Sequence, residues 1–369
     1  MFDYCCASAA SFSSRAFLAA TLDSAQSYSQ FQGSLRQMPS AKGMKIDRMP
    51  KAARNQQYHR EPRMLAALMV VPLVTVALHR EEAMRHFYVI ANYAKPHTLF
   101  CVQEIKEYLT AKGAECVIAG PAASDNGRYH YTDTGRIPGD TQCVIVLGGD
   151  GTLIQAAHDL KGTSYPLIGI NLGNLGYLSE VDQENLFPSL DRLLMDDFFI
   201  EERMTLLGEI VRDGQIVCSD TALNDIVLTR LESMKMLRFS LYVNDQFITR
   251  YNADGIIVAT PTGSTAYSLS AGGPIVLPTS NLFVLTPICA QTLTTARSIV
   301  LPDNAYIRLI VEAKDGIRML HQAVSFDSDN VVSVHPGDEI VIKSASDKVR
   351  LIRLDQRSFL DTLGKKLSR

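Results

Sequence analysis

The stretch Val144-Ile145-Val146-Leu147-Gly148-Gly149-Asp150-Gly151-Thr152 decides how this chain can fold. Its apolar half predicts a strand, its glycines and aspartate predict a bend, and Leu153 to Leu160 follows as a candidate helix. Glycines at a strand-to-helix bend let backbone N–H groups approach phosphate oxygens closely, and the helix N-terminus adds partial positive charge. The bend contains no lysine, so it matches neither the G-x-x-x-x-G-K-[ST] pattern nor G-x-G-x-x-G.

The carboxylate in this bend, Asp150, is the first candidate functional group. A carboxylate beside phosphates is repulsive unless it meets a metal ion or removes a proton. The bend therefore favours a phosphotransferase whose acceptor is a hydroxyl group. The alternative is an ordinary strand-to-helix turn in which Asp150 caps the helix, and the bend alone does not separate the two interpretations.

Strand-like and helix-like periods alternate from Met84 to about residue 203. The pattern predicts strands at 87–92, 115–119, 143–147 and 167–170, helices at 99–111, 153–160 and 186–194, and a polar loop at 124–140. A second glycine-rich bend, Asn171 to Gly176, follows the last of these strands. Strands that alternate with helices without tight hairpins predict a parallel, doubly wound sheet. Ligands bind at the carboxyl ends of such strands, where both glycine bends lie.

Past about Met204 the hydrophobic period changes to two. Asp213-Gly214, Asn244-Asp245 and Asp315-Gly316 each lie between β-rich runs, which is a strong hairpin signal. We therefore expect an α/β protein: an N-terminal doubly wound, Rossmann-like α/β domain at 84–203 and a mostly antiparallel β domain at 204–347. A strand at 348–354 and a helix at 357–366 are expected to return to the first domain, which then also takes residues 348–369.

Residues 1–83 differ from the rest of the chain. They hold ten Lys and Arg against six Asp and Glu, whereas the remainder holds 26 against 33. The apolar run 64–78 is short for a membrane span and is interrupted by Pro72, so a targeting or membrane role is the less favoured alternative. We expect residues 1–83 to be a poorly ordered extension, or sequence upstream of the true start, with Met84 as a natural initiator.

Composition limits the classes of partner and the cellular compartment that we expect for this protein. A mildly acidic body argues against a nucleic-acid binder, and we expect neither a nucleic acid nor a membrane as partner. The seven cysteines show no metal-ligand spacing, and several lie in apolar, strand-like runs. They are interpreted as reduced, buried thiols of a cytoplasmic protein.

Two further segments carry polar chemistry. Residues 254–274 are crowded with hydroxyls, small residues, glycine and proline, and Tyr267 adds an aromatic face suited to a base. Ser264 is not in a G-x-S-x-G elbow, so a hydrolase nucleophile is not expected. Asn224 and Asp225 interrupt a strand-like run, where an acidic residue can hold ribose hydroxyls. The structural alternatives are an irregular bulged loop for 254–274 and an edge-strand bulge for Asn224-Asp225.

Together, 148–152, Asn224-Asp225 and 254–274 occur in the order and spacing of the bacterial NAD kinases, the ATP-NAD kinase family, which the chain resembles from about Met84 to Arg369. The short Gly-Gly-Asp-Gly motif is shared with lipid kinases and phosphofructokinases, whereas the long third motif is highly specific. The resemblance implies an enzyme that phosphorylates the 2′-hydroxyl of the adenosine ribose of NAD with ATP, giving NADP. It also implies Mg²⁺ or another divalent cation carried by the ATP phosphates, with no metal ligand in the protein. A homodimer or homotetramer with pockets completed across subunits is implied as well.

The resemblance further assigns roles to single residues. Asp150 is the implied general base and Gly151 helps to hold the nucleotide. The other implied nucleotide-binding positions are Asn224, Asp225, Lys235, Asn252, Asp254, Thr265, Ala266, Tyr267, Ser268, Leu269 and Ser270. Several positions depart from common family members: Gln155 stands where many have Arg or Lys, Asn252 replaces a basic residue, Ala290-Gln291 replaces Pro-His, and Ser298 replaces Pro.

Two alternatives to an NAD kinase are kept. A lipid or sugar kinase of the same superfamily accounts for 148–152 but not for Asn224-Asp225 or Tyr267. A non-catalytic dinucleotide sensor keeps the pocket without the chemistry. The sequence also leaves open ATP or inorganic polyphosphate as the donor, and NAD or NADH as the acceptor.

Overall fold

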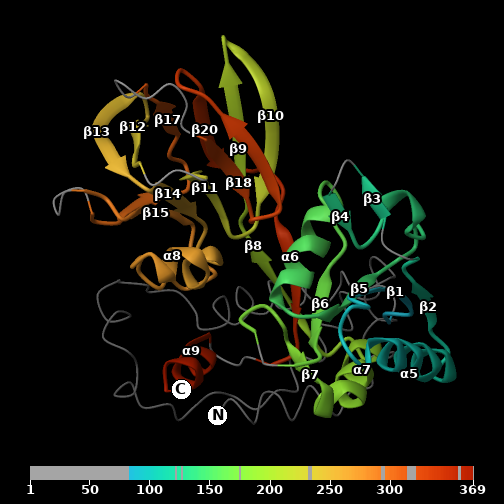
Figure 1. The fold of residues 1–369 in the computed structure, drawn as a ribbon. Helices are drawn as coiled ribbons and strands as arrows, with labels where there is room; N and C mark the ends of the chain where they lie inside the picture. The colour runs from blue at the N-terminus through green and yellow to red at the C-terminus, as the bar shows by residue number, and fades with distance from the viewer. Residues whose placement is uncertain are drawn as a thin grey trace, which may run out of the picture. The chain divides into compact units, whose positions relative to one another are not determined.

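The structure, a computed structural model, describes residues 83–120, 123–125, 128–173, 176–231, 235–291, 296–313, 321–355 and 359–368 (Figure 1). The expectations for residues up to 82 and for the Asp315-Gly316 hairpin lie outside these ranges. Across the described residues, no helix combines the length and the apolar character needed to pass through a bilayer.

A seven-stranded, mostly parallel sheet forms the first layer, in the order β2-β1-β5-β6-β21-β8 with β7 beside β6. Only the pairing of β21 with β8 is antiparallel among these neighbours. The strands are β1 (His86–Ala91), β2 (Glu115–Ile118), β5 (Cys143–Gly148), β6 (Leu167–Asn171), β7 (Val181–Asp182), β8 (Phe199–Arg203) and β21 (Val349–Arg353). Strand β5 is buried along its whole length, which is expected of a parallel strand covered on both faces.

Helices cover both faces of this sheet. These helices are α5 (Thr98–Ala111), α6 (Asp150–Asp159) and α7 (Leu186–Leu194), and α9 (Phe359–Leu367) follows β21 at the C-terminal end. Alternate residues of β5 divide between two cores: Ile145 packs in the core with α5 and α7, and Val146 packs in the core with α6. The connections that leave the adjacent strands β1 and β5 therefore pass to opposite faces. Their carboxyl ends form the switch point at which doubly wound sheets bind ligands.

Residues between β2 and β5 do not form the plain polar loop that we expected. They contain a short hairpin, β3 (Ala123–Asp125) and β4 (Arg128–His130), and a 3₁₀ turn, η3 (Thr134–Arg136). Asp159 of α6 holds this part, because its side chain accepts hydrogen bonds from the backbone N–H groups of Tyr131 and Thr132. A second 3₁₀ turn, η4 (Gln183–Asn185), precedes α7.

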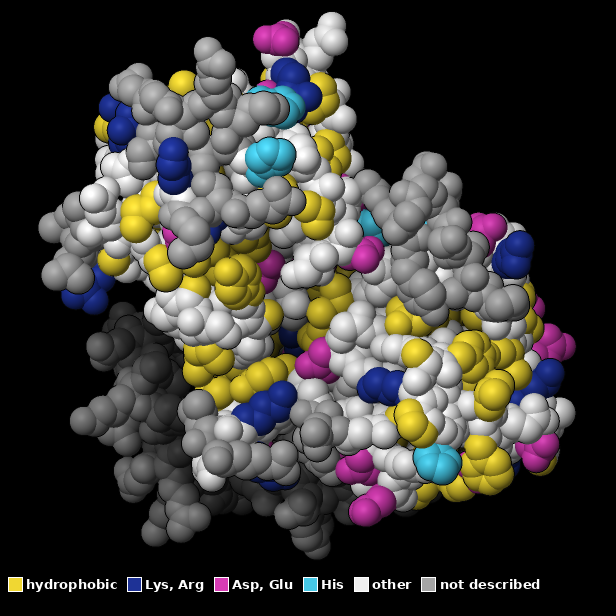
Figure 2. All heavy atoms as spheres, viewed as in Figure 1, with side chains coloured by type: hydrophobic (Ala, Val, Ile, Leu, Met, Phe, Trp, Pro, Cys, Tyr) yellow, Lys and Arg dark blue, Asp and Glu magenta, His cyan; other side chains and the backbone are white. Residues whose placement is uncertain are grey.

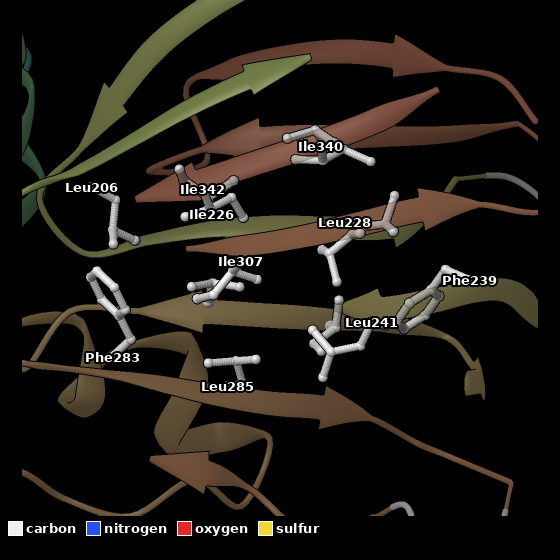
Figure 3. Close-up of a cluster of buried hydrophobic side chains, with 14 of the residues drawn as sticks. Leu206, Ile226, Leu228, Phe239, Leu241, Phe283, Leu285, Ile307, Ile340 and Ile342 are labelled. Carbon is white, nitrogen blue, oxygen red and sulfur yellow. The ribbon is translucent and has the colours of Figure 1, made fainter. Parts of the chain in front are cut away.

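Two six-stranded antiparallel sheets follow, in the orders β10-β9-β20-β17-β12-β13 and β16-β15-β14-β11-β18-β19. Their strands are β9 (Leu206–Arg212), β10 (Gln215–Ala222), β11 (Asp225–Arg230), β12 (Leu237–Val243), β13 (Gln246–Ala253), β14 (Gly255–Ala259), β15 (Leu282–Ile288), β16 (Ile299–Pro302), β17 (Ile307–Val311), β18 (Gln322–Phe326), β19 (Asn330–Val334) and β20 (Glu339–Ser344). Figure 3 shows side chains from both sheets, such as Ile226 and Ile342, pointing into one apolar core. The period of two predicted from the sequence arises because one face of each sheet is buried in this core.

The turns between these strands explain how the sheets close. Asp213 and Gly214 join β9 to β10 with φ of 52° and 75°, and Asn244 and Asp245 join β12 to β13 with φ of 50° and 61°. Both hairpins were predicted from their Asp, Asn and Gly residues, which tolerate left-handed backbone. At the C-terminal end, β21 joins the first sheet beside β6 and β8, so the return of this segment is confirmed.

One structural alternative for the strands is wrong, and one hairpin was not predicted. Strand β11 pairs with both β14 and β18, so Asp225 begins a central strand directly after Asn224, and the edge-strand alternative fails. A further hairpin between β18 and β19 turns at Asp327 and Ser328, with φ of 50° and 64°, and was not predicted.

Candidate active site

The glycine bend between β5 and α6 brings backbone rather than side chains to the edge of the parallel sheet. A β-carbon at Gly148 would lie 2.2 Å from Oγ1 of Thr152, so the chain can turn this tightly only with glycine there. Gly149 is the N-cap of α6 and offers no side-chain acceptor to the first helical turn. The helix therefore begins at Asp150, earlier than predicted, and its first N–H groups face outward at the switch point.

The carboxylate of Asp150 does not cap its own helix, so that alternative is wrong. Its Oδ2 accepts the N–H of Tyr177 at 2.7 Å, and its Oδ1 accepts the N–H of Leu178 at 3.2 Å and the hydroxyl of Ser179 at 3.3 Å. A β-carbon at Gly176 would lie 1.7 Å from Oδ1, so the end of the second glycine bend packs directly on this carboxylate. The two bends predicted from the sequence thus meet at one acidic group.

A lysine reaches the glycine bend from the neighbouring strand. β1 is followed by a turn in which Asn92 donates its N–H to Leu147 O at 3.0 Å and accepts the N–H of Lys95 at 3.2 Å. A β-carbon placed on Gly149 would lie 3.2 Å from Nζ of Lys95. The sequence analysis missed Lys95 because nothing local to 148–152 shows which strand lies beside β5.

Asp327 holds the backbone of the Asn224-Asp225 pair. Its Oδ1 accepts the N–H groups of Asn224 at 2.7 Å and Asp225 at 3.0 Å, and its Oδ2 accepts that of Leu223 at 2.6 Å. From the other side, Thr260 donates its hydroxyl to Leu223 O at 2.6 Å and its N–H to Asn224 O at 2.8 Å. The sequence analysis also missed Asp327. The run Asp327-Ser328-Asp329 consists of typical turn residues and was the signal that could have indicated a turn there.

Among the described residues, the side chains of this pair are not held by the protein as their backbone is. Within the described ranges, neither the Asn224 amide nor the Asp225 carboxyl hydrogen-bonds to the protein. Asp225 is only 3% exposed, and burial, with the nearby charge of Asp327, raises its pKa to about 7. Since buried polar groups are normally hydrogen-bonded, the pair is suited to a polar ligand that supplies the missing partners.

The segment after β14 packs against this pair through η5 (Gly263–Thr265) and α8 (Tyr267–Ser270). A β-carbon at Gly263 would lie 2.0 Å from Asn224 O, so this contact requires glycine. Tyr267 is 43% exposed and offers its ring, whereas Ser268 is buried and hydrogen-bonds to Thr286 Oγ1 at 3.0 Å. The remaining predicted positions lie beside Tyr267 in the same segment: Thr265, Ala266, Leu269 and Ser270. The irregular-loop alternative therefore fails for this part.

Three predicted residues, Asp254, Asn252 and Lys235, lie elsewhere. Asp225 pairs with Ala259 at one end of the β11–β14 ladder, and Asp254 immediately precedes the other end. Four residue steps of strand separate these ends by about 13 Å. One chain therefore does not bring all the predicted nucleotide-binding residues into one group.

Two members of this second group, Asp254 and Asn252, hydrogen-bond to arginines. Asp254 accepts two hydrogen bonds from Arg230, at 2.8 Å and 3.0 Å, and Asn252 Oδ1 accepts a long one from Arg238 at 3.5 Å. Lys235 is exposed. A two-point arginine–carboxylate pair fixes the orientation of both side chains, so the Asp254 carboxylate is held in place rather than mobile.

A partly buried ion cluster lies beside the loop that holds Asp150. Arg353 of β21 donates to Leu178 O at 3.2 Å, to Glu180 at 2.9 Å and to Glu201 at 3.0 Å. Glu201 also accepts from Arg203, whose pKa is lowered because burial penalises its charge. The cluster fixes the backbone that presents its N–H groups to Asp150.

A fixed carboxylate beside a glycine bend, at the switch point of a parallel sheet, is the arrangement of a nucleotide-dependent phosphotransferase. Residues 87–198 match the family model of the ATP-NAD kinase N-terminal domain, and residues 223–354 match that of the ATP-NAD kinase C-terminal domain. The NAD kinase of Lachnospira eligens is 39% identical over 296 residues, which cover 77% of this chain and 100% of that protein. The chain belongs to the ATP-NAD kinase family.

Solved structures agree with this assignment. The NAD kinase of Archaeoglobus fulgidus, solved in complex with ATP, is 25% identical with a TM-score of 0.61, covering 77% of this chain and 99% of that one. Yeast NADH kinase complexed with NADH is 23% identical with a TM-score of 0.69, covering 78% and 88%, and that likeness concerns the fold alone. The expected fold class is confirmed, and the lipid- or sugar-kinase alternative is not supported.

Proposed function

We propose that Asp150 removes the proton of the adenosine-ribose 2′-hydroxyl of NAD while that oxygen attacks the γ-phosphoryl group of ATP. The activity itself, that of an NAD kinase, follows from family membership. The supporting observation is that backbone N–H groups of Tyr177 and Leu178 fix the Asp150 carboxylate beside the glycine bend. Phosphoryl transfer mainly needs alignment and charge neutralisation, so a fixed acceptor for one proton at this edge suits the reaction.

The dinucleotide is proposed to bind at the start of β11. Asn224 and Asp225 would hydrogen-bond its ribose hydroxyls, because their side chains lack protein partners while their backbone is fixed. Tyr267 would stack on the adenine ring with its exposed face. Gly151 would help to hold the nucleotide phosphates with its N–H group.

A divalent cation, Mg²⁺ or a similar ion, is proposed to arrive on the donor phosphates as part of the substrate. Asp150 already accepts three hydrogen bonds, so it is a poor candidate for a resident ion. Among the described residues, the one cluster with metal-ligand geometry is His86, Glu115 and Asp140, at the amino ends of the strands and away from Asp150. When bound, such a cation neutralises charge on the β- and γ-phosphates.

The separation of the two residue groups supports a homodimer or homotetramer. Since Asp225 and Asp254 lie at opposite ends of the β11–β14 ladder, a single dinucleotide site would use Asp254, Asn252 and Lys235 from a second copy. Figure 2 shows hydrophobic side chains gathered over α8 and the neighbouring strands. Three exposed hydrophobic side chains in α8 and the residues that follow it are Tyr267, Leu277 and Val300, at 43%, 50% and 51%. Burying such side chains favours association.

The parallel-sheet domain and the antiparallel β domain are proposed to bind different substrates. Residues 84–203, joined by 348–369, would bind the donor, and 204–347 would bind NAD. A cytoplasmic location is proposed because Cys101, Cys116 and Cys143 are free and buried, as thiols are in reducing compartments, although Cys289 is exposed. Burial raises the pKa of the Cys116 thiol to about 11, so it stays protonated and unreactive.

An assay of the purified full chain tests the activity. NAD, ATP and Mg²⁺ are supplied, and an NADP-specific dehydrogenase reports the product. NADP formation is expected. If no NADP forms with any pair of donor and acceptor although NAD binds, the chain would instead be a non-catalytic dinucleotide sensor. Replacing ATP by inorganic polyphosphate, and NAD by NADH, separates the donors and acceptors that the sequence leaves open.

Mixed oligomers test the shared pocket. Asp225→Ala and Asp254→Ala are each expected to lose most activity alone. When both are co-expressed with different tags, about a quarter of the pockets in random dimers would carry neither substitution. Recovered activity in the doubly tagged fraction supports pockets shared between subunits. A doubly tagged oligomer without activity would contradict them.

A further inference from the structure

We infer that Lys95 binds the polyphosphate chain of the donor and holds it over the glycine bend. The inference rests on the proposed function, because it needs a triphosphate at the carboxyl edge of β5. It assigns to that site a cation that the bend itself lacks. The ligand chemistry is an anionic phosphate chain, which ATP and inorganic polyphosphate share.

The position of Lys95 follows from the sheet topology. β1 and β5 are neighbours, and the helices that follow them, α5 and α6, cover opposite faces. The loops after the two strands therefore flank the crevice at the switch point, where doubly wound sheets bind phosphates. Lys95 lies in the loop after β1 and Gly149 in the loop after β5, and they approach each other across this crevice.

The loop that carries Lys95 is held in place by Asn92. Asn92 Oδ1 accepts the N–H of Ala94 at 3.0 Å, Asn92 O accepts that of Lys95 at 3.2 Å, and Asn92 Nδ2 donates to Thr152 Oγ1 at 3.4 Å. The last bond joins the loop directly to the first turn of α6. The ammonium group is thus presented from a loop attached to the helix that begins with Asp150.

The charge of Lys95 has no protein counter-ion. Four other lysines, Lys112, Lys161, Lys343 and Lys348, form ion pairs, whereas no ion pair among the described residues includes Lys95. Lys95 is also half-buried. A partly desolvated ammonium next to backbone N–H groups attracts an anion strongly, because charge-assisted hydrogen bonds gain strength away from water.

Helix α6 offers no lysine or arginine for this role, and the neutral amide of Gln155 does not replace one. Gln155 stands one turn into the helix, and its amide donates to Asp159 Oδ1 at 2.9 Å. That bond commits the Gln155 amide to the next turn of the helix and not to the bend. Lys95 therefore supplies the positive charge that this chain offers at Gly149.

Kinetics of Lys95→Met, Lys95→Arg and Lys112→Met test the inference. Lys112 lies at the end of α5 and pairs with Asp191, so it is a matched lysine outside the site. Lys95→Met is expected to lower kcat/KM for ATP about 10- to 100-fold, while the Kd for NAD stays within twofold. Lys95→Arg is expected to recover most of the loss, and Lys112→Met to behave as wild type.

Competition with free tripolyphosphate separates the phosphate chain from the adenosine end. Tripolyphosphate is expected to inhibit wild type and to weaken about tenfold or more with Lys95→Met. Unchanged ATP kinetics and unchanged inhibition in a folded Lys95→Met variant would overturn the inference. So would an effect confined to NAD binding. If wild type itself forms no NADP, the proposed function fails instead, and calorimetric titration of wild type and Lys95→Met with tripolyphosphate still decides whether Lys95 binds phosphate.

Discussion

Arg203 donates a hydrogen bond to Thr262 Oγ1 at 3.1 Å and thereby joins the last strand of the parallel sheet to the segment that follows β14. Both side chains are buried, with 3% and 5% of their surface exposed. The same arginine shares Glu201 with Arg353, which holds the loop around Asp150. The proposed base and the proposed adenine site therefore rest on one connected set of hydrogen bonds.

Replacing Thr262 by valine removes this link and keeps the side-chain shape. We expect kcat/KM for NAD to fall several-fold, and the free energy of unfolding to fall by about 1 kcal/mol, because one buried hydrogen bond is lost. Thr205→Val is the matched control, since Thr205 donates its buried hydroxyl to Asp347 O, in a different part of the fold. A kinetic loss of equal size in both variants would show that only stability had changed.

Asp150→Asn tests the base directly. An amide cannot accept the ribose proton, and we expect kcat to fall about 10²- to 10⁴-fold while NAD still binds, as calorimetry would show. Asp159→Asn lies in the same helix, where the carboxylate bonds to backbone of Tyr131 and Thr132. It should reduce stability more than turnover. Turnover that survives in Asp150→Asn would remove Asp150 from the role of base.

Gly176→Ala tests how the base is positioned. The new methyl group would overlap Asp150 Oδ1, at 1.7 Å, so the carboxylate or the loop must move. We expect a loss in kcat of about 10²-fold, since misplacing a reacting group by 1 Å has an effect of this size. Gly173→Ala is the comparison, because a β-carbon there meets nothing closer than 4.0 Å. Wild-type kcat in Gly176→Ala would mean that the carboxylate tolerates displacement.

Protonation of Asp225 predicts how stability depends on pH. Its pKa is raised from an ordinary value near 4 to about 7, chiefly by burial, so the folded state holds the proton more tightly than the unfolded state. This contribution to stability is fully present below about pH 4 and is lost as the pH rises through 7. Asp225→Asn should therefore gain stability relative to wild type between pH 4 and 8. Urea denaturation at several pH values measures the difference, which would be flat if Asp225 did not titrate.

Dinucleotide binding should release a proton for the same reason. A ribose hydroxyl that donates to Asp225 favours the ionised carboxylate and lowers its pKa. Near pH 7, titration of NAD by calorimetry should then give a binding enthalpy that depends on the ionisation enthalpy of the buffer. Equal enthalpies in phosphate and Tris buffer would show that Asp225 does not change protonation.

Local patterns predicted the elements whose boundaries are set locally. Helix α7 was predicted with its observed bounds, Leu186–Leu194, because its apolar residues recur with helical spacing. Helix α6 was predicted to start too late, since Gly151 and Thr152 are weak helix formers and Gly149 is a cap without a side chain. The β3–β4 hairpin lies in a polar run without a strand pattern and was missed.

The candidate site shows the same division. Asp150, Asn224 and Asp225 stand in motifs, so the sequence alone was enough to propose them as site residues. Lys95 and Asp327 act on those motifs from other strands, and only the pairing of β1 with β5 and of β11 with β18 brings them close. The sequence also did not show the distance between Asp225 and Asp254, because that distance depends on the register of β11 against β14.

Because β21 lies near the C-terminal end of the chain, its return to the parallel sheet also determines when during synthesis the Asp150 loop can be supported. Arg353 braces Leu178, whose N–H holds Asp150, yet it is made long after both. A ribosome must finish nearly the whole polypeptide before this brace exists, since domains assemble as their segments emerge. Fragments that stop before β21 would carry the glycine bend without its support, so an incomplete chain would have no working catalyst with which to consume ATP.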